Sequence, residues 1–563
     1  MIRVRKAVSK PVAFSVLAVL GAVLYFRTLD VPFYFDDSAW IVDNPAISTF
    51  PDILQPRGVS FLSFYLNLKY FGLSLPSLHA TNILIHIGTA YLVFLLLSRF
   101  SSLSGFPALL GALVYLVHPV QTQAVNYTVQ RMTLLSAFFT LLSCNLYLWY
   151  RNMATERPGE WIKKWGLYFL ALAMGWFALQ SKQNAAILPF LLILLEWGRQ
   201  PEEEGTFLRG CLRILPFVLV PLYYGFVTVI LKQGGGLGGL SNAEFLQKAD
   251  VVTPLHYFVT EWKVLFIYLR LLLLPYRQIF DYGYPFTDTL WAWDNLFAGL
   301  GLVGLVGIGV WGLMRRSLFG IGLLWILVAL SVESTFIPLD PIFEHRLYLP
   351  LVGFCILVAA VYIRFFKRPY LLVGILLLFC GLTLARNEVW RSPADLWKQD
   401  VSHGSQSYRS YFGYADALHN AGEKESAARM YEAGADLFLG SESIDQSNPK
   451  FLYNLGVVFE RLEKYQRAES FYRKAVLNRP GYGLAYYGLG VSLYRQERFA
   501  KAEQAFGNAM VFLPGKPNPI NARADTLIRL GRGEEARLLA ERLKTVSPNQ
   551  YRELMEELRQ RDP

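Results

Sequence analysis

The sequence has few cysteines and lacks the glycine motifs of soluble nucleotide-binding domains. The four cysteines are Cys144, Cys211, Cys355 and Cys380. They lie in or beside apolar runs and show no CxxC spacing. This pattern excludes a disulfide-stapled scaffold. No Rossmann-type glycine fingerprint precedes the apolar part of the chain, so a soluble nucleotide-binding domain is not expected there. Densely spaced metal ligands are also lacking.

Charged residues are scarce over the first two thirds of the chain. Hydrophobic residues make up 53% of the 563 residues, whereas ~45–50% is usual for soluble domains. The mean hydropathy is positive, at +0.30. Runs such as 83–97 and 371–384 are almost uncharged, but the sequence after about Arg386 is rich in Glu, Lys and Arg. We therefore expect a membrane-embedded domain, 1–388, followed by a soluble domain, 389–563.

The net charge of +11 does not indicate nucleic-acid binding. Lys and Arg cluster at the ends of apolar segments, as the positive-inside bias of membrane proteins requires. The stretch 1–10, which contains Arg3, Arg5, Lys6 and Lys10, precedes the apolar stretch 11–26, and no small-x-small cleavage site follows it. We expect this stretch to be retained as a first span, with the N-terminus in the cytoplasm.

A membrane span needs about 20 apolar residues, ~17–25 in practice. Candidate spans are 11–29, 79–98, 104–118, 132–150, 165–180, 184–197, 212–231, 293–313, 318–337, 348–365 and 369–386. If these eleven stretches alternate across the bilayer, every short and strongly basic connector falls on the cytoplasmic side. The outer side then receives the soluble domain and the loops 30–78, 119–131, 181–183, 232–292 and 338–347.

The stretch 256–274 is apolar but contains Glu261, Lys263 and Arg270. A further crossing here would move the basic pair Arg315 and Arg316 to the outer side, against the charge bias. An interfacial or re-entrant helix that ends at Pro275 fits the charge pattern better.

The soluble domain contains a repeat of helical pairs. The small residues Ala468, Ala502 and Ala536 recur at intervals of 34 residues, the period of the tetratricopeptide repeat (TPR). Leucine, glycine and aromatic positions recur around each of them, and an earlier copy is centred on Ala427. Small residues let paired helices approach, while large ones fill the space between repeats. About four repeats are expected, and the fold class is all-α: a polytopic helical bundle with a C-terminal TPR solenoid.

The first outer loop carries adjacent carboxylates, Asp36 and Asp37, in an aromatic setting before Asn44 and Pro45. Acidic groups next to a span cost desolvation free energy unless a function or a structural partner uses them. A structural interpretation is also open, in which one of the pair caps a helix that begins near Trp40.

Other polar side chains lie at the outer ends of the expected spans. They include His79, His118, Arg131 and Lys182, together with Glu344, His345 and Arg346 in one short segment. Ionisable groups at such positions are candidates for function by default. A single histidine at the end of a span is nevertheless more often a hydrogen-bonded structural group.

In this order, these segments resemble those of the transmembrane and tetratricopeptide-repeat O-mannosyltransferases. The resemblance covers the acidic loop, the His118-Pro119-Val120 segment with Arg131, Lys182, the Glu344–Pro350 segment and the C-terminal repeats. It implies a GT-C glycosyltransferase fold with an acidic motif in the first outer loop. The chain departs from the family pattern at Gln183, where an acidic residue is expected after Lys182.

The resemblance implies an inverting transfer of a sugar from a polyprenyl- or dolichyl-phosphate donor to a protein hydroxyl. The anionic leaving group requires cations, and Arg131, Lys182 and Arg346 are the expected phosphate ligands. Asp36 or Asp37 would be the catalytic base, with Asp36 slightly favoured by the resemblance. His118, Glu344, His345 and His79 are secondary candidates. A divalent metal, Mg²⁺ or Mn²⁺, held by Asp36 and Asp37 is a less favoured alternative.

Two other functions remain open at this stage. A GT-C transferase could modify a glycolipid or polysaccharide, with the repeats recruiting partners, or the chain could be a membrane-anchored TPR scaffold without catalytic activity. A scaffold would need one anchor rather than eleven spans. The position of the repeats on the acceptor side favours a protein acceptor or partner. The expected location is the bacterial inner membrane with the repeats in the periplasm, or the endoplasmic reticulum membrane with the repeats in the lumen.

Overall fold

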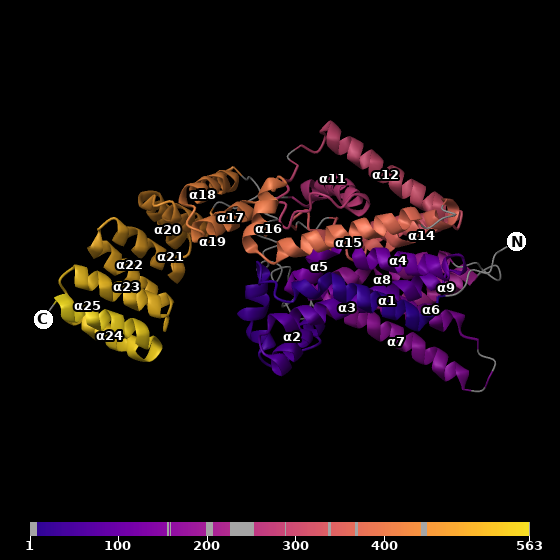
Figure 1. Ribbon diagram of the computed structural model, residues 1–563, viewed down its shortest axis with the longest axis horizontal. Helices are drawn as coiled ribbons and strands as arrows, with labels where there is room; N and C mark the ends of the chain where they lie inside the picture. The colour runs from indigo at the N-terminus through magenta and orange to yellow at the C-terminus, as the bar shows by residue number, and fades with distance from the viewer. Residues whose placement is uncertain are drawn as a thin grey trace. The chain divides into compact units, whose positions relative to one another are not determined.

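The computed structural model describes residues 8–154, 157, 159–198, 206–225, 253–287, 289–335, 339–365, 370–440 and 447–561. Over these residues the chain is helical and forms no β-strand, which confirms the all-α prediction. The chain divides into two compact units, Met1–Gln406 and Ser407–Pro563. Figure 1 shows both units, which are described separately below.

Five helical segments of unit 1 are long and apolar enough to cross a membrane. They are Lys10–Thr28 (α1, Lys10–Tyr25, with the 3-10 turn after it), Leu75–Ser98 (α3), Thr128–Asn152 (α6, Arg131–Asn152, with the turn before it), Trp293–Met314 (α12) and Leu372–Trp390 (within α15, Tyr370–Trp390). The bent pair Phe106–Val117 (α4) and Pro119–Asn126, which meet at 49°, can form a sixth. These helices are those of a multi-pass membrane protein, but the predicted count of eleven spans is not confirmed.

The other expected spans correspond to shorter or more charged helices. Three are short and apolar: Gln183–Gly198 (which includes α8, Leu188–Gly198), Leu318–Leu330 (α13) and Leu351–Phe365 (α14). The other two are longer helices, each with a charged residue in its first turn. They are Glu160–Ser181 (α7) and Thr206–Gly225 (α9). The stretch 256–274 forms α11, Pro254–Leu273, which ends just before Pro275 as expected. Parts of 212–231, 232–292, 318–337 and 369–386 lie outside the described residues.

Small residues let the helices of unit 1 approach closely. A Cβ atom added to Gly320 of α13 would lie 2.3 Å from the backbone nitrogen of Leu313, and one added to Gly353 of α14 would lie 2.4 Å from the Gly322 carbonyl oxygen. Glycine at such positions allows backbone contact between helices in a bilayer. Figure 1 shows α1, α3 and α6 side by side along the length of the unit, with the short helix α2, Gly58–Phe71, at one end.

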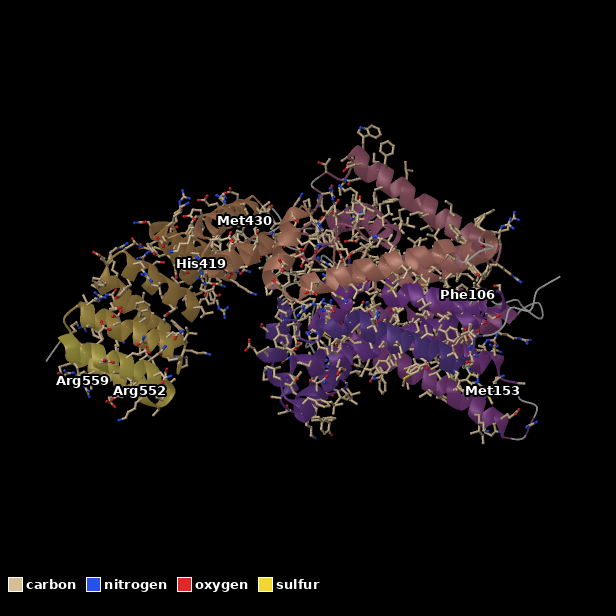
Figure 2. All side chains as sticks on the ribbon, in the orientation of Figure 1. Phe106, Met153, His419, Met430, Arg552 and Arg559 are labelled. Atoms are coloured by element: carbon tan, nitrogen blue, oxygen red, sulfur yellow. The ribbon has the colours of Figure 1, made fainter. Side chains whose placement is uncertain are left out.

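The connections of unit 1 gather at its two ends. At one end Arg151 forms an ion pair of 2.5 Å with Glu196, and the Trp197 indole N–H donates to the Leu313 carbonyl at 2.8 Å. Figure 2 shows Phe106 and Met153 near the same end. The ion pair of Arg151 and the hydrogen bond of Trp197 join connectors that the charge pattern assigned to the cytoplasmic side. The loops assigned to the outer side meet at the opposite end, where the candidate site lies.

Unit 2 is a stack of antiparallel helix pairs. The pairs are α17 and α18 (Tyr408–Asn420, Lys424–Leu439), α19 and α20 (Pro449–Arg461, Tyr465–Asn478), α21 and α22 (Gly483–Arg495, Phe499–Phe512), and α23 and α24 (Pro517–Arg529, Gly533–Val546). A further helix, α25, covers Pro548–Arg561. Ala468, Ala502 and Ala536 are fully buried, as the repeat pattern predicts. The expectation of about four repeats is confirmed.

Candidate functional site

The two adjacent carboxylates of the first loop lie in opposite environments. Asp37 is fully buried, and its carboxylate accepts hydrogen bonds from the backbone N–H groups of Tyr34 at 3.0 Å and Val129 at 2.7 Å. Its own N–H donates to the Tyr34 carbonyl at 2.8 Å, which closes a tight turn. Burial raises the pKa of Asp37 to about 7, although both N–H donors oppose the shift. Asp37 therefore fastens the loop to the turn before α6.

Asp36, in contrast, has an exposed side chain. Phe35 before it adopts a positive φ of 40°, which non-glycine residues rarely do, and its ring stacks on Phe280 at 4.8 Å. The Asp36 N–H donates to the Tyr127 hydroxyl at 3.0 Å, and its carboxylate interacts with the same hydroxyl. This turn presents Asp36 at the surface while Asp37 points inward. The alternative that Asp37 caps the next helix is wrong, because its side chain makes no cap bond there.

Two of the expected cations converge on a carboxylate that the sequence analysis missed. The Lys182 ammonium lies 2.8 Å from Oε1 of Glu333, and Nε of Arg346 lies 3.9 Å from Oε2 of the same residue. Lys182 follows the end of α7, Glu333 lies in the turn after α13, and Arg346 lies in a 3-10 turn before α14. Three segments far apart in sequence thus contribute to one buried charge cluster.

The electrostatics of this cluster favour its charged form. Burial alone would raise the pKa of Glu333, but Lys182 and Arg346 outweigh burial and lower it. Burial lowers the pKa of Lys182; Glu333 opposes this effect, while the charges of Arg346 and Arg57 add to it. The neighbouring position holds Gln183, so the carboxylate that pairs with Lys182 comes from another part of the chain. Because the expected span 318–337 included Glu333, the sequence analysis did not recognise it as a residue at the end of a helix.

Arg57 connects this cluster to the acidic turn. It precedes α2 with a φ of 65°, and its guanidinium lies 4.7 Å from the centre of the Trp40 ring. Burial lowers the pKa of Arg57, whereas Asp36 raises it. The adjoining segment is attached to the end of α7, because the Ser60 hydroxyl donates to the Ser181 carbonyl at 3.1 Å. Arg57 is therefore a third cation near Asp36 and Lys182, and it was not among the site residues predicted from the sequence.

Arg131 lies nearby, but neutral oxygens occupy its guanidinium. It is fully buried and donates to the Asn82 side chain at 2.8 Å and to the Leu78 carbonyl at 2.8 Å. It also donates to the Asn67 side chain and lies 4.4 Å from the Phe64 ring centre. These contacts join α6 to α2 and α3. The predicted role of Arg131 as a phosphate ligand remains a prediction.

Three secondary candidates make contacts typical of structural residues. Glu344 accepts hydrogen bonds from the Gln278 amide at 2.7 Å and from the Tyr282 hydroxyl at 2.9 Å. His118 lies 3.0 Å from the Leu272 carbonyl, and His79 lies 2.8 Å from the Val31 carbonyl. None of these contacts reaches Lys182 or Arg346, and the roles predicted for the three residues remain predictions.

His345 and Glu261 lie beside the charge cluster. The pKa of His345 falls well below its usual value, first because of burial and then because of Lys182 and Arg346. Its Nδ1 atom is buried without a hydrogen-bond partner among the described residues. Glu261 of α11 is 2% exposed, and burial raises its pKa to about 7 against the opposing charge of Arg346. A neutral imidazole and a second carboxyl group thus flank the cation pair.

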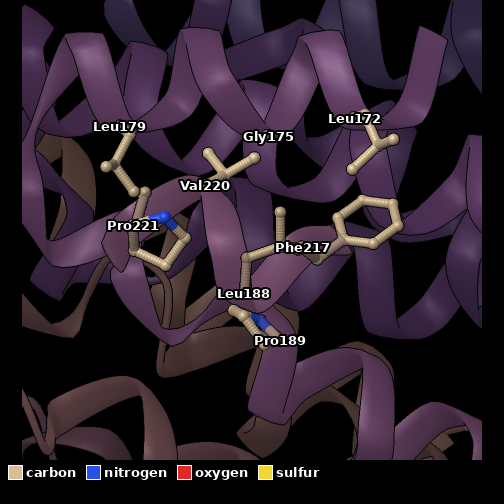
Figure 3. Close-up of a pocket in the computed structure, with 9 residues that line it drawn as sticks. Leu172, Gly175, Leu179, Leu188, Pro189, Phe217, Val220 and Pro221 are labelled. Atoms are coloured by element: carbon tan, nitrogen blue, oxygen red, sulfur yellow. The ribbon is translucent and has the colours of Figure 1, made fainter. Parts of the chain in front are cut away.

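A small cavity lies elsewhere in unit 1 and is too small for a ligand. Figure 3 shows its apolar lining, which comes from α7, α8 and α9 and includes Gly175, Phe217 and Pro221. Its volume of about 10 Å³ gives room for roughly one water molecule. The apolar lining offers such a molecule no partner, so this space is a packing gap.

Within the described ranges, no three His, Cys, Asp or Glu residues come together as a metal-binding group. Both carboxylate oxygens of Asp37 already accept backbone N–H groups. A divalent metal held by Asp36 and Asp37 remains a prediction.

The tetratricopeptide repeat family matches the chain at residues 414–483 and 453–517. Among solved structures, the TPR protein YrrB, described as having an unusual peptide-binding site, aligns with a TM-score of 0.24 and 18% identity. That alignment covers 32% of this chain and 89% of the YrrB chain.

Curated relatives match about three quarters of the chain. Protein O-mannosyl-transferase F38B6.6 of Caenorhabditis elegans is 22% identical over 74% of this chain and 61% of its own length. Human protein O-mannosyl-transferase TMTC4 is 25% identical over 74% of this chain and 65% of its own length, and human TMTC1 is 23% identical over 76% and 55%. The chain thus spans between about half and two thirds of the relatives it matches. Over about three quarters of its length, it is related to the TMTC protein O-mannosyl-transferases, as the sequence motifs indicated.

Proposed function

We propose that this chain is an integral-membrane glycosyltransferase that moves a sugar from a polyprenyl-phosphate carrier to a hydroxyl group of a protein. The convergence of Lys182 and Arg346 on Glu333, with Arg57 in electrostatic reach of both Lys182 and Asp36, supports the proposal most directly. The names of the relatives make mannose the first sugar to test. The bundle would have the GT-C arrangement with eleven crossings.

The cations match the requirements of the leaving group. A sugar phosphodiester leaves as a lipid phosphate that gains negative charge, and Arg and Lys stabilise such oxygens through charge-assisted hydrogen bonds. Arg346 offers a planar fork of donors, while Lys182 adds a compact charge. Glu333 holds both cations in place before the donor binds. Phosphate oxygens would then share these cations with Glu333.

Asp36 would act as the general base. The acceptor hydroxyl transfers its proton to the Asp36 carboxylate while its oxygen forms a bond to the anomeric carbon. The bond between that carbon and the phosphate oxygen breaks, and the electron pair leaves with the lipid phosphate. Attack from the face opposite the phosphate inverts the anomeric centre. A carboxylate is a weak base, but oxocarbenium character at the sugar carbon reduces the proton removal required.

The soluble unit would bind the acceptor protein or a partner on the outer side of the membrane. This location is the periplasm of a bacterium or the lumen of the endoplasmic reticulum. The outer position follows from an odd number of crossings that begin in the cytoplasm.

The proposal can be tested with purified chain in detergent, radiolabelled polyprenyl-phosphate mannose and a protein extract from the outer compartment. Asp36→Asn should lower the rate of sugar transfer by about 10²–10⁴-fold, the usual contribution of a general base. Lys182→Gln and Arg346→Gln should also lose transfer. Lys263→Gln is a matched control, because Lys263 forms an ion pair of 3.0 Å with Asp294 outside the site. Wild-type rates in a folded Asp36→Asn variant would disprove the base assignment, and label found only in lipid would disprove the protein acceptor.

A further inference from the structure

Helix α16, Pro393–Ser402, follows α15 and is the last helix of unit 1 (Figure 1). The Ser392 hydroxyl caps its first turn by accepting the Asp395 N–H at 3.2 Å, and proline at the first helical position suits such a start. Trp397 and Asp400 lie three residues apart on the buried face of this helix. Helix α16 therefore directs one large ring and one carboxylate into the interior of unit 1.

The Asp400 carboxylate holds the backbone of the loop that follows α11. Its two oxygens accept the consecutive N–H groups of Phe280 at 2.7 Å and Asp281 at 2.9 Å. Hydrogen bonds to a carboxylate are stronger than those between neutral groups. Just beyond α16, the Ser405 hydroxyl adds a bond to the same loop, because it donates to the Asp281 carbonyl at 2.6 Å. Helix α16 and the residues after it therefore fix the position of Phe280.

The Trp397 ring packs against the acidic turn, residues 34–37. Its centre lies 5.0 Å from that of the Phe35 ring and 5.4 Å from that of the Phe280 ring, and those two rings stack on each other at 4.8 Å. Phe35 has the positive φ that directs Asp36 outward. Such a backbone conformation persists only where its surroundings hold it, and here Trp397 and Phe280 enclose the Phe35 ring.

Phe280 is also joined to the segment that carries Arg346. Its carbonyl accepts a hydrogen bond from the Gln123 amide at 2.9 Å, and the oxygen of the same amide accepts the His345 N–H at 2.7 Å. His345 directly precedes Arg346 in the 3-10 turn Glu344–Leu347. The residue that α16 fixes thus contacts the acidic turn through its ring and the Arg346 segment through its carbonyl.

We propose that Trp397 and Asp400 are positioning residues for sugar transfer. They hold Phe35 and Phe280 in place, and through these two residues they hold Asp36 at a fixed position relative to Arg346. The use of this arrangement in catalysis rests on the proposed function, in which Asp36 is the base. The holding of the acidic turn by α16 does not depend on any substrate and can be measured separately.

The first test is hydrogen exchange of the full chain in nanodiscs, measured by mass spectrometry over residues 33–41. Trp397→Ala should exchange at least about tenfold faster than wild type there, because loss of packing makes local opening easier. Trp397→Phe keeps an aromatic ring and should exchange as wild type does. Trp291→Ala is the matched control, because Trp291 is 79% exposed. Trp397→Leu replaces Trp397→Ala where alanine prevents folding.

The second test measures sugar transfer with the lipid-linked donor. Trp397→Ala should lower kcat at least about tenfold, because a small misplacement of a catalytic group is costly. It should leave the KM for the donor unchanged, because Lys182 and Arg346 keep their partner Glu333. Trp397→Phe should recover most of the rate. Asp400→Asn, which replaces one acceptor oxygen with an NH₂ group, should lower kcat as Trp397→Ala does.

Combination with Asp36→Asn distinguishes positioning of the base from general support of the fold. If Trp397 acts through Asp36, the double variant Trp397→Ala with Asp36→Asn should be no slower than Asp36→Asn alone, because residues that act as a unit are not additive. The same fold-loss from Trp397→Ala in both backgrounds would overturn the inference.

Unchanged exchange over residues 33–41 in Trp397→Ala, or wild-type turnover in that variant, would also overturn the inference. Absence of sugar transfer in the wild type has a different meaning, because it refutes the proposed function. Faster exchange in Trp397→Ala would then still support the holding of the acidic turn by α16, and unchanged exchange would refute both.

Discussion

At the residue scale, the neighbouring carboxylates Asp36 and Asp37 differ because of the backbone turn between them. The positive φ of Phe35 directs one side chain outward, and two N–H donors hold the other inward. Backbone strain of this kind persists only where the surroundings compensate for it. Here the stacked ring of Phe280 and the Tyr127 hydroxyl provide the compensating contacts. A structural acid therefore fixes the turn that presents its neighbour at the surface.

This difference predicts opposite effects of the same substitution. Asp37→Asn replaces one acceptor oxygen with an NH₂ group, so one buried backbone N–H loses its partner. We expect this variant to lose about 1–3 kcal/mol of stability. Asp36→Asn should change stability by less than about 0.5 kcal/mol, as is usual at exposed positions. Thermal unfolding in detergent measures both variants, and equal midpoints would contradict the structural role of Asp37.

Glu333 predicts a dependence of stability on pH. Its folded-state pKa is lowered below the unfolded value of ~4.3. Its contribution to stability is therefore present above about pH 4.3 and is lost as the pH falls through the lower folded value. Glu333→Gln leaves the buried Arg346 and the partly buried Lys182 without their carboxylate and should cost about 3 kcal/mol at pH 7.

The difference in unfolding temperature between wild type and Glu333→Gln should shrink as the pH falls below about 4. Glu388→Gln provides the control, because Glu388 pairs with Arg27 at 3.3 Å where both side chains are at least half exposed. Such surface pairs contribute only about 0–1 kcal/mol. A difference in unfolding temperature between wild type and Glu333→Gln that stays the same from pH 3 to pH 7 would exclude the proposed ionisation of Glu333.

At the element scale, the helix pairs of unit 2 depend on glycine where an aromatic ring crosses. A Cβ atom at Gly456 of α19 would lie 2.4 Å from the Tyr472 ring, and one at Gly490 of α21 would lie 2.5 Å from the Phe506 ring. We expect Gly456→Ala to destabilise unit 2 by about 1–3 kcal/mol through overpacking. Gly481→Ala is the control, since its Cβ would meet only Phe512 at 3.9 Å. Thermal unfolding of the full chain, followed by circular dichroism, should give a lower midpoint for Gly456→Ala than for Gly481→Ala. Equal midpoints would contradict the overpacking at Gly456.

The sequence predicts these repeats well because a period of 34 residues records a local packing rule. Each small residue faces its own partner helix, so Ala468 and Ala502 reveal the pairs without knowledge of any distant contact. Glu333 could not be predicted in this way. Its partners Lys182 and Arg346 come from other helices, and a hydropathy count extends the apolar run of α13 past the point where the helix ends. Helix ends depend on tertiary contacts more than on composition.

For the whole molecule, the contacts at the two ends of unit 1 agree with alternating connectors. Arg151 and Glu196 meet at one end, while Lys182 and Glu333 meet at the other. Each helix between such contacts begins at one end and finishes at the opposite one. This geometry fits alternate crossings even where a helix, such as α13, is short for a full bilayer. Short helices are accommodated by local thinning of the bilayer.

Alternation predicts which residues are accessible from each side of the membrane. We would introduce single cysteines at exposed positions, Thr49 in the first loop, Gln466 in unit 2 and Lys163 in α7, in a background that lacks Cys144, Cys211, Cys355 and Cys380. In sealed vesicles with the outer face exposed, an impermeant maleimide should label Thr49→Cys and Gln466→Cys but not Lys163→Cys. Detergent should make all three accessible and provides the internal control. Labelling of only one of Thr49→Cys and Gln466→Cys would place the acidic turn and the repeats on opposite sides. An acceptor bound by the repeats could not then reach Asp36, because a sugar transfer that joins both sites requires them in the same compartment.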